Sequence, residues 1–169
     1  MSLVLYPEVH KWDQVTTTPA TLAIGRHILR STRAAWSGIV AFDSWLANTD
    51  RASGNNLLIG VDADPRAPRV GAIFCDYAYS MLHAGWKKGS CAAVAVPGIL
   101  SALMDLLDRD AALATAERIK GFPAATVAEI VSRIPPTHLE NESKEVIIEA
   151  LTERAKTVPD VIASSTKRG

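Results

Sequence analysis

The chain has little of several features that assign a protein to a class at once. It carries no net charge, with 18 basic and 18 acidic residues, so it has no electrostatic footprint for nucleic acid or an anionic membrane. Its two cysteines, Cys75 and Cys91, form neither a disulfide framework nor a zinc spacing. No apolar run reaches the roughly 20 residues of a membrane span, and residues 1–12 lack the basic-then-apolar layout of a signal peptide. We therefore expect a cytoplasmic protein with no nucleic-acid or membrane partner.

The composition is that of a globular domain. Of the 169 residues, 48% are hydrophobic and 21% are charged, which is enough apolar surface for a core without a metal or disulfides. The length fits one domain, and we assign residues 1–169 to a single unit.

One stretch carries the chemical information. Residues 42–59 combine the end of an amphipathic helix, a polar loop and a short apolar strand. The loop holds Asp50 and Asn55, at the Asp-x-x-x-x-Asn spacing of phosphotransferase catalytic loops. Asp43 and Asn48 share this spacing, but they lie in or at the edge of a helical apolar pattern. The loop position therefore favours Asp50 and Asn55 as the catalytic residues.

A predicted hairpin follows the loop. Its strands cover about residues 56–61 and 69–75, with a polar turn between them, and the second strand ends on Asp76. A hairpin whose two ends deliver Asn55 and Asp76 to one place makes a two-ligand Mg²⁺ site, because Mg²⁺ prefers oxygen ligands with phosphates and water. We expect Asp50, Asn55 and Asp76 to converge in space.

The runs FDSWLANTDRASGNNLLI and IFCDYA resemble the C-terminal lobe of the HipA-like kinases and, more distantly, the phosphoinositide kinases. The resemblance covers roughly residues 37–160 and is densest from 42 to 78. Aminoglycoside and choline kinases share the Asp-to-Asn spacing, but they usually place a histidine two residues before the aspartate, where this chain has Asn48. The resemblance implies an α+β, mainly α-helical fold: a protein kinase-like C-terminal lobe with one short antiparallel β-hairpin, a motif core at 37–86 and a helical remainder at 95–165.

The resemblance also implies roles for individual residues. Asp50 and Asn55 are then catalytic, and Asn55 and Asp76 bind the metal. Arg51 and Asp43 support the loop; a buried Asp43 carboxylate needs partners, and we expect it to bond to the loop backbone. Implied cofactors are Mg²⁺ and ATP, the implied substrate is a serine or threonine of a protein, and the family implies a toxin–antitoxin setting.

The sequence lacks the signatures of the N-terminal lobe, the part of a kinase that binds the phosphates of ATP. Before Asp50 there are only Gly25 and Gly38, thirteen residues apart, and one lysine, Lys11. A kinase needs a glycine-rich strand–turn–strand and a strand lysine here. We thus expect the N-terminal lobe to be absent. Three hypotheses stay open: a kinase C-lobe completed by an N-lobe from a partner chain or a longer product, a catalytically inactive degenerate lobe that binds proteins, and a plain helical domain.

The rest of the chain predicts helices. We expect an extended or irregular arm over residues 1–17, a helix that starts at Pro19 with Thr18 as its cap, and a second helix over about 36–46. Later helices are expected at 99–107, at 111–120 ending on Gly121, from a capping box at Thr126, and from Ser143 until Pro159 breaks or kinks it.

Overall fold

The computed structural model describes residues 8–15, 17–48, 56–62, 69–74, 80 and 103–165. This part of the chain is mainly helical, as the sequence predicts. The elements follow one another as β1 (Glu8–Lys11), α1 (Trp12–Val15), α2 (Pro19–Ser31), α3 (Arg33–Trp45), β2 (Leu57–Asp62), β3 (Arg69–Phe74), η3 (Met104–Leu106), α5 (Arg109–Lys120), α6 (Ala124–Ser132) and α7 (Asn141–Ser165).

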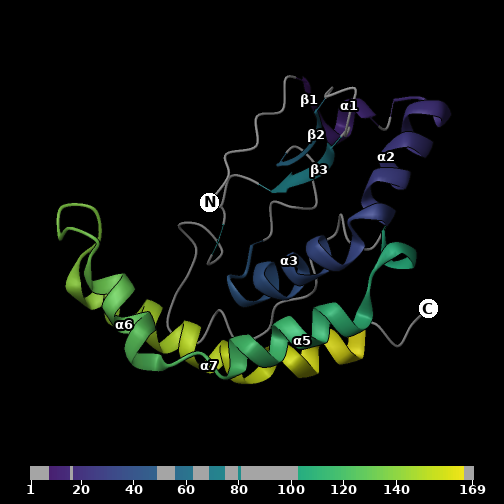
Figure 1. Ribbon diagram of the computed structural model, residues 1–169. Helices are drawn as coiled ribbons and strands as arrows, with labels where there is room; N and C mark the ends of the chain where they lie inside the picture. Colours follow the sequence, from purple (N-terminus) through teal and green to yellow (C-terminus); the bar gives the residue numbers. More distant parts are fainter. Residues whose placement is uncertain are drawn as a thin grey trace.

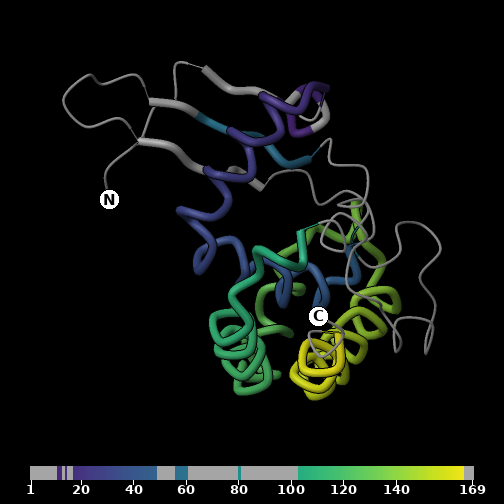
Figure 2. Tube along the Cα trace, turned by 90° about the vertical axis from the view of Figure 1, so that its right-hand side faces the viewer, coloured from purple at the N-terminus to yellow at the C-terminus, as the bar shows by residue number. Residues whose placement is uncertain are grey.

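Helix α3 lies in the middle of the molecule. The sheet lies on one side of it together with α1 and α2, and the pair α5 and α7 lies on the other side (Figure 1). Figure 2 shows α5 and α7 almost end-on and side by side, consistent with the many residue contacts between them. Helix α6 packs on α7. Helix α3 therefore packs against both α5 and α7.

The predicted hairpin is confirmed. Strands β2 and β3 pair in antiparallel fashion from Leu57 opposite Phe74 to Asp62 opposite Arg69. A third strand was not expected: β1 pairs with β2, and Lys11 lies opposite Leu58. The prediction of an extended or irregular arm over residues 1–17 missed this pairing, because residues 8–11 are a strand of the sheet. Four residues with little apolar alternation give no strand signal, and the backbone of β2 supplies the pairing that makes them a strand.

The start of α2 agrees with the prediction. Thr18 is extended and is the N-cap, and its hydroxyl accepts a hydrogen bond from the backbone N–H of Thr21 at 3.2 Å. The hydroxyl of Thr21 accepts in turn from the N–H of Thr18 at 3.2 Å, which completes a capping box. Pro19 occupies the first helical position, where its missing N–H has no helical acceptor to lose.

The core is built around one face of α3. The buried residues of this helix are Trp36, Ser37, Val40, Ala41, Asp43, Ser44 and Trp45. They pack against buried side chains of α2, β2, α5, α6 and α7, among them Leu29, Leu57, Ile59, Ala112, Ala116, Val127, Leu151, Val158 and Ile162. Small residues at the contact of α3 with α5 let the two backbones approach closely.

Polar contacts fix the first half of α3 against the start of α5. Asp108 is the N-cap of α5, and its carboxylate accepts a hydrogen bond from the N–H of Ala111 at 3.0 Å. The N–H of Asp108 donates to the buried hydroxyl of Ser37 at 2.9 Å. Arg33 lies 3.5 Å from the other carboxylate oxygen of Asp108. One aspartate thereby joins the two helices.

Two later boundaries differ from the prediction. The expected helix through residue 107 is, over its described part, a single 3₁₀ turn, η3, after which Leu107 is extended. The capping box at Thr126 is wrong: α6 begins at Ala124, and Pro123 is the N-cap without a side-chain cap. The carbonyl of Pro123 accepts from the N–H of Thr126 at 2.9 Å, so this threonine lies inside the first turn.

The ends of α5 and α7 also correct the prediction. α5 ends before Gly121 as expected, but Gly121 has a φ of −81°, so its lack of a side chain is not used for a left-handed turn. Helix α7 does not end at Pro159 and continues to Ser165. Proline removes one helical hydrogen bond, yet the flanking Val158 and Ile162 are buried in the core. Packing of this face holds the helix together across the proline.

Candidate active site

Most of the predicted site lies outside the described residues. Asp50, Arg51, Asn55 and Asp76 all fall there, and their convergence stays a prediction. The structure does describe Asp43, the end of α3 that leads to the loop, and the hairpin that follows the loop. These parts form the frame of the candidate site.

The end of α3 has the hydrogen bonds of a Schellman motif. The N–H of Asn48 donates to the carbonyl of Asp43 at 2.9 Å, and the N–H of Ala47 donates to the carbonyl of Ser44 at 3.4 Å. Ala47 has a φ of +52° and is fully buried. This left-handed position favours glycine, and alanine there carries backbone strain of about 1–2 kcal/mol. Packing around Ala47 therefore holds its backbone in the left-handed conformation, which sets the direction of the chain after α3.

The side chains of Asp43 and Asn48 reinforce this turn. Both are buried, and the Nδ2 of Asn48 donates a hydrogen bond to the Oδ1 of Asp43 at 3.1 Å. A Schellman motif often places an apolar contact between these two positions, and here a polar pair occupies them. The second Asp-x-x-x-x-Asn match in the sequence is thus a buried pair at the helix end. The structure thus gives Asp43 one partner, the Asn48 amide, and its role in supporting the loop stays a prediction.

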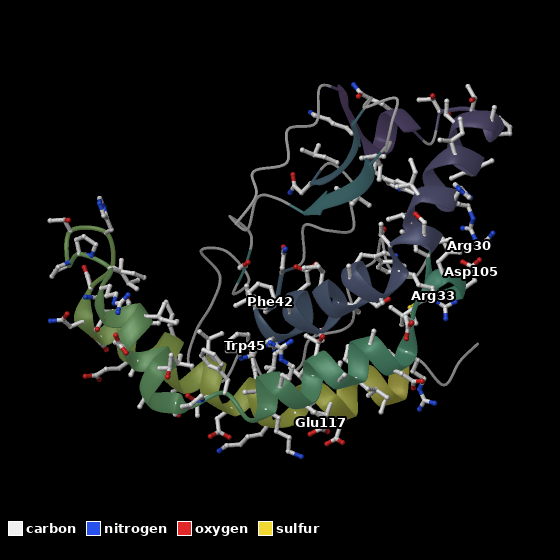
Figure 3. The ribbon with its side chains drawn as sticks, in the orientation of Figure 1. Arg30, Arg33, Phe42, Trp45, Asp105 and Glu117 are labelled. Atoms are coloured by element: carbon white, nitrogen blue, oxygen red, sulfur yellow. The ribbon has the colours of Figure 1, made fainter. Side chains whose placement is uncertain are left out.

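Helix α7 holds the same end of α3. The indole Nε1 of Trp45 donates to the carbonyl of Leu151 at 2.8 Å, and the Nε of Arg154 donates to the carbonyl of Trp45 at 2.6 Å. Figure 3 labels Trp45 and Phe42 at this end of α3, whereas Arg33 lies at the other end. The ring of Trp45 also makes edge contacts with Phe42, at 5.9 Å between centroids, and with Phe122, at 5.8 Å.

Arg154 was not predicted from the sequence, although a signal is present. It follows Leu151 by three residues and precedes Val158 by four, so it lies on the apolar face of α7. A cation on such a face has to find an acceptor, because burial of an unpaired charge is costly. One acceptor is a backbone carbonyl that lies 109 residues earlier in the chain, a relationship that local patterns do not indicate.

The hairpin register bears on the two predicted metal ligands. Leu57 lies directly opposite Phe74, so the chain enters β2 and leaves β3 at the same end of the hairpin. In the sequence, Asn55 precedes Leu57 by two residues and Asp76 follows Phe74 by two. Carboxylate and amide oxygens are ligands that suit Mg²⁺, so the donor chemistry of this pair fits that ion.

The described residues offer no other metal site. Among them, no group of three or more histidine, cysteine, aspartate or glutamate side chains could hold a metal ion. Within the same part of the chain, no helix has both the length and the apolar character needed to cross a membrane.

Comparisons with known proteins leave the family open. No protein-family model, no curated protein and no solved structure matches the chain.

Proposed function

We propose that the chain is the C-terminal lobe of a HipA-like kinase, which transfers the γ-phosphoryl group of Mg²⁺-ATP to a serine or threonine of a protein. The N-terminal lobe, with the glycine-rich loop and the strand lysine, comes from a partner chain or from a longer gene product. Mg²⁺ neutralises phosphate charge when the nucleotide is bound, and the chain's own residues position the reacting groups.

One observation carries the proposal. The buried helix α3 and the antiparallel hairpin of β2 and β3 flank residues 49–55 in the chain, a segment of polar sequence. The pairing of Leu57 with Phe74 brings the two strand ends together, one beside Asn55 and the other beside Asp76 in the sequence. This is the order in which kinases arrange their catalytic aspartate and two metal ligands.

Each residue has a defined part in the proposed reaction. Asp50 accepts the proton of the attacking hydroxyl and orients it toward the phosphorus. Asn55 and Asp76 offer one amide and one carboxylate oxygen to the metal. Asp43 and Asn48 hold the start of the loop, through the hydrogen bond of 3.1 Å between their side chains. Positioning and charge neutralisation account for most of the rate in phosphoryl transfer, and these three roles supply both from the lobe.

Calorimetry with ATP and Mg²⁺, together with a co-purification search for the missing lobe, tests the proposal. The chain alone should bind Mg²⁺-ATP weakly and show no autophosphorylation, and the completed complex should transfer phosphate. Asp50→Asn should abolish transfer with little loss of nucleotide binding, and Asp76→Asn should also weaken metal-dependent binding. Asp110→Asn, at an exposed aspartate of α5, is the matched control and should change neither.

Two results would overturn the proposal. Robust turnover by the 169-residue chain alone would contradict the need for a second lobe. A stable complex without any nucleotide binding would favour the alternative, a degenerate lobe that binds a protein partner. The observation that favours this alternative is the sequence before Asp50, which holds a single lysine and no glycine-rich loop.

A further inference from the structure

A buried cation lies at the C-terminal end of α3. Arg154 belongs to α7, and only 4% of its surface is exposed. Its Nε lies 2.6 Å from the carbonyl oxygen of Trp45. Trp45 is the last residue of α3, so its carbonyl oxygen has no N–H group four residues later within the helix to accept from. Arg154 therefore satisfies a helix end from outside and places positive charge at the negative end of the helix dipole.

A second hydrogen bond runs in the opposite direction between the same two helices. The indole of Trp45 donates to the carbonyl of Leu151 at 2.8 Å, one turn before Arg154 on α7. Trp45 is thus a donor through its side chain and an acceptor through its backbone. The two bonds fix both the distance between the helices and the rotation of the last turn of α3.

We propose that Arg154 is a positioning residue for phosphoryl transfer, an inference that rests on the proposed function. It holds the end of α3, and the chain continues from there through Ala47 and Asn48. Asp50 follows Asn48 by two residues. A displacement of the catalytic group by about 1 Å can lower a rate by about 100-fold, so a fixed loop origin matters for catalysis. Through this contact α7, far away in the sequence, fixes the last turn of α3, from which the chain continues toward Asp50.

The nature of the side chain supports a positioning role over a purely stabilising one. A buried cation contributes little net stability compared with an apolar side chain of the same volume, because its desolvation offsets its interactions. A guanidinium offers five donors in a rigid plane, so it can hold a carbonyl in one defined direction. Lysine offers a flexible point charge and would keep the sign of the charge but lose this direction.

Amide hydrogen exchange on the full chain tests the positioning directly. The amides of Leu46, Ala47 and Asn48 report on the end of α3, since all three donate to carbonyls of its last turns. Arg154→Met should speed their exchange by about tenfold or more, the loss expected for a hydrogen bond to a charged group. Arg154→Lys should give a smaller increase. The amides of Trp36, at the other end of α3, and Ala112, at the start of α5, should stay within twofold.

A matched control separates position from burial of charge. Lys144 is the other buried cation of α7, with 9% of its surface exposed, and lies in the first turn and a half of the helix. Lys144→Met should leave the exchange of residues 46–48 unchanged. If Arg154→Met leaves it unchanged as well, or speeds exchange equally throughout the chain, the positioning role is overturned.

The activity of the completed kinase gives the second readout. Arg154→Met should lower kcat about tenfold or more and leave the KM for ATP within about twofold, with partial recovery in Arg154→Lys. An equal loss of kcat in Lys144→Met would overturn the positioning role. Absence of transfer by the unsubstituted complex would overturn the proposed function instead, and the exchange pattern would still decide whether Arg154 fixes the end of α3.

Discussion

Gly38 of α3 and Thr115 of α5 lie so close that a side chain on the glycine would collide. A Cβ atom built at Gly38 falls 2.8 Å from the Oγ1 of Thr115, and the Cβ of this threonine is 3.6 Å away. The absence of a side chain at one position of α3 thus sets how closely the two central helices approach. This contact leads to the first prediction.

Gly38→Ala should have opposite effects in two backgrounds. Alanine is better than glycine in a helix by about 1 kcal/mol, but in the natural chain the collision with Oγ1 should cancel this gain or exceed it. In a Thr115→Ala background the remaining contact at 3.6 Å is an ordinary one, and Gly38→Ala should stabilise by about 1 kcal/mol. Urea unfolding of the four proteins measures the coupling. Equal gains in both backgrounds would contradict the close approach.

Two buried serines of α3 should respond differently to the same substitution. Ser37 accepts a hydrogen bond from the N–H of Asp108 at 2.9 Å, whereas the hydroxyl of Ser44 is buried without a hydrogen-bond partner. Ser37→Ala should cost about 1–2 kcal/mol, because the N–H of Asp108 loses its acceptor. Ser44→Ala should be neutral or should stabilise the protein by up to about 1 kcal/mol. The substitution removes a buried hydroxyl that has no hydrogen-bond partner, and alanine favours the helix.

Thermal or urea unfolding of the two serine variants checks this contrast, and each serves as the control for the other. Both residues are at most 1% exposed and lie seven positions apart on one helix face, so their burial is matched. A loss at Ser44 as large as that at Ser37 would mean that both hydroxyl groups contribute in the same way.

The strained turn at Ala47 gives the third prediction. Ala47→Gly and Ala116→Gly each delete one fully buried methyl group, worth about 0.8 kcal/mol. At Ala116, inside α5, glycine should add about 1 kcal/mol of helix loss, for a total near 2 kcal/mol. At Ala47, where φ is +52°, glycine relieves strain of about 1–2 kcal/mol. Unfolding should therefore find Ala47→Gly close to neutral, and a loss like that of Ala116→Gly would refute the strain.

Local signals predicted the elements that are decided locally. The pair Thr18 and Pro19 fixes the start of α2, since a capping hydroxyl and a preset φ act within one turn. Two short apolar runs on either side of a polar turn give β2 and β3. The capping signal failed at Thr126, because Pro123 is the N-cap of α6. Of the two outcomes expected at Pro159, a break or a kink, the break is excluded, because the buried face of α7 holds the helix together to Ser165.

Tertiary relationships were beyond the reach of these signals. Strand β1 exists because β2 offers an unpaired edge, and Ala47 takes a glycine-like conformation because its surroundings over-determine it. At the candidate site, the sequence predicted that Asp43 is buried and needs partners, and the structure gives Asn48 as one. It did not indicate Arg154, whose acceptor lies 109 residues away.

The buried pair of Asp43 and Asn48 gives the last prediction. Asp43→Ala removes the acceptor of the Asn48 amide and leaves a donor that is 1% exposed without this bond, so it should cost about 2–3 kcal/mol. Asp43→Asn keeps an oxygen that can accept from the same amide and should cost clearly less. Asn48→Ala in the Asp43→Ala background should cost little more, because both side chains of this hydrogen bond are then gone.

Urea unfolding of the double-mutant cycle should give a coupling of about 1–2 kcal/mol, with Asp110→Ala as an exposed control near zero. Strictly additive losses would show that the 3.1 Å contact does not hold the end of α3.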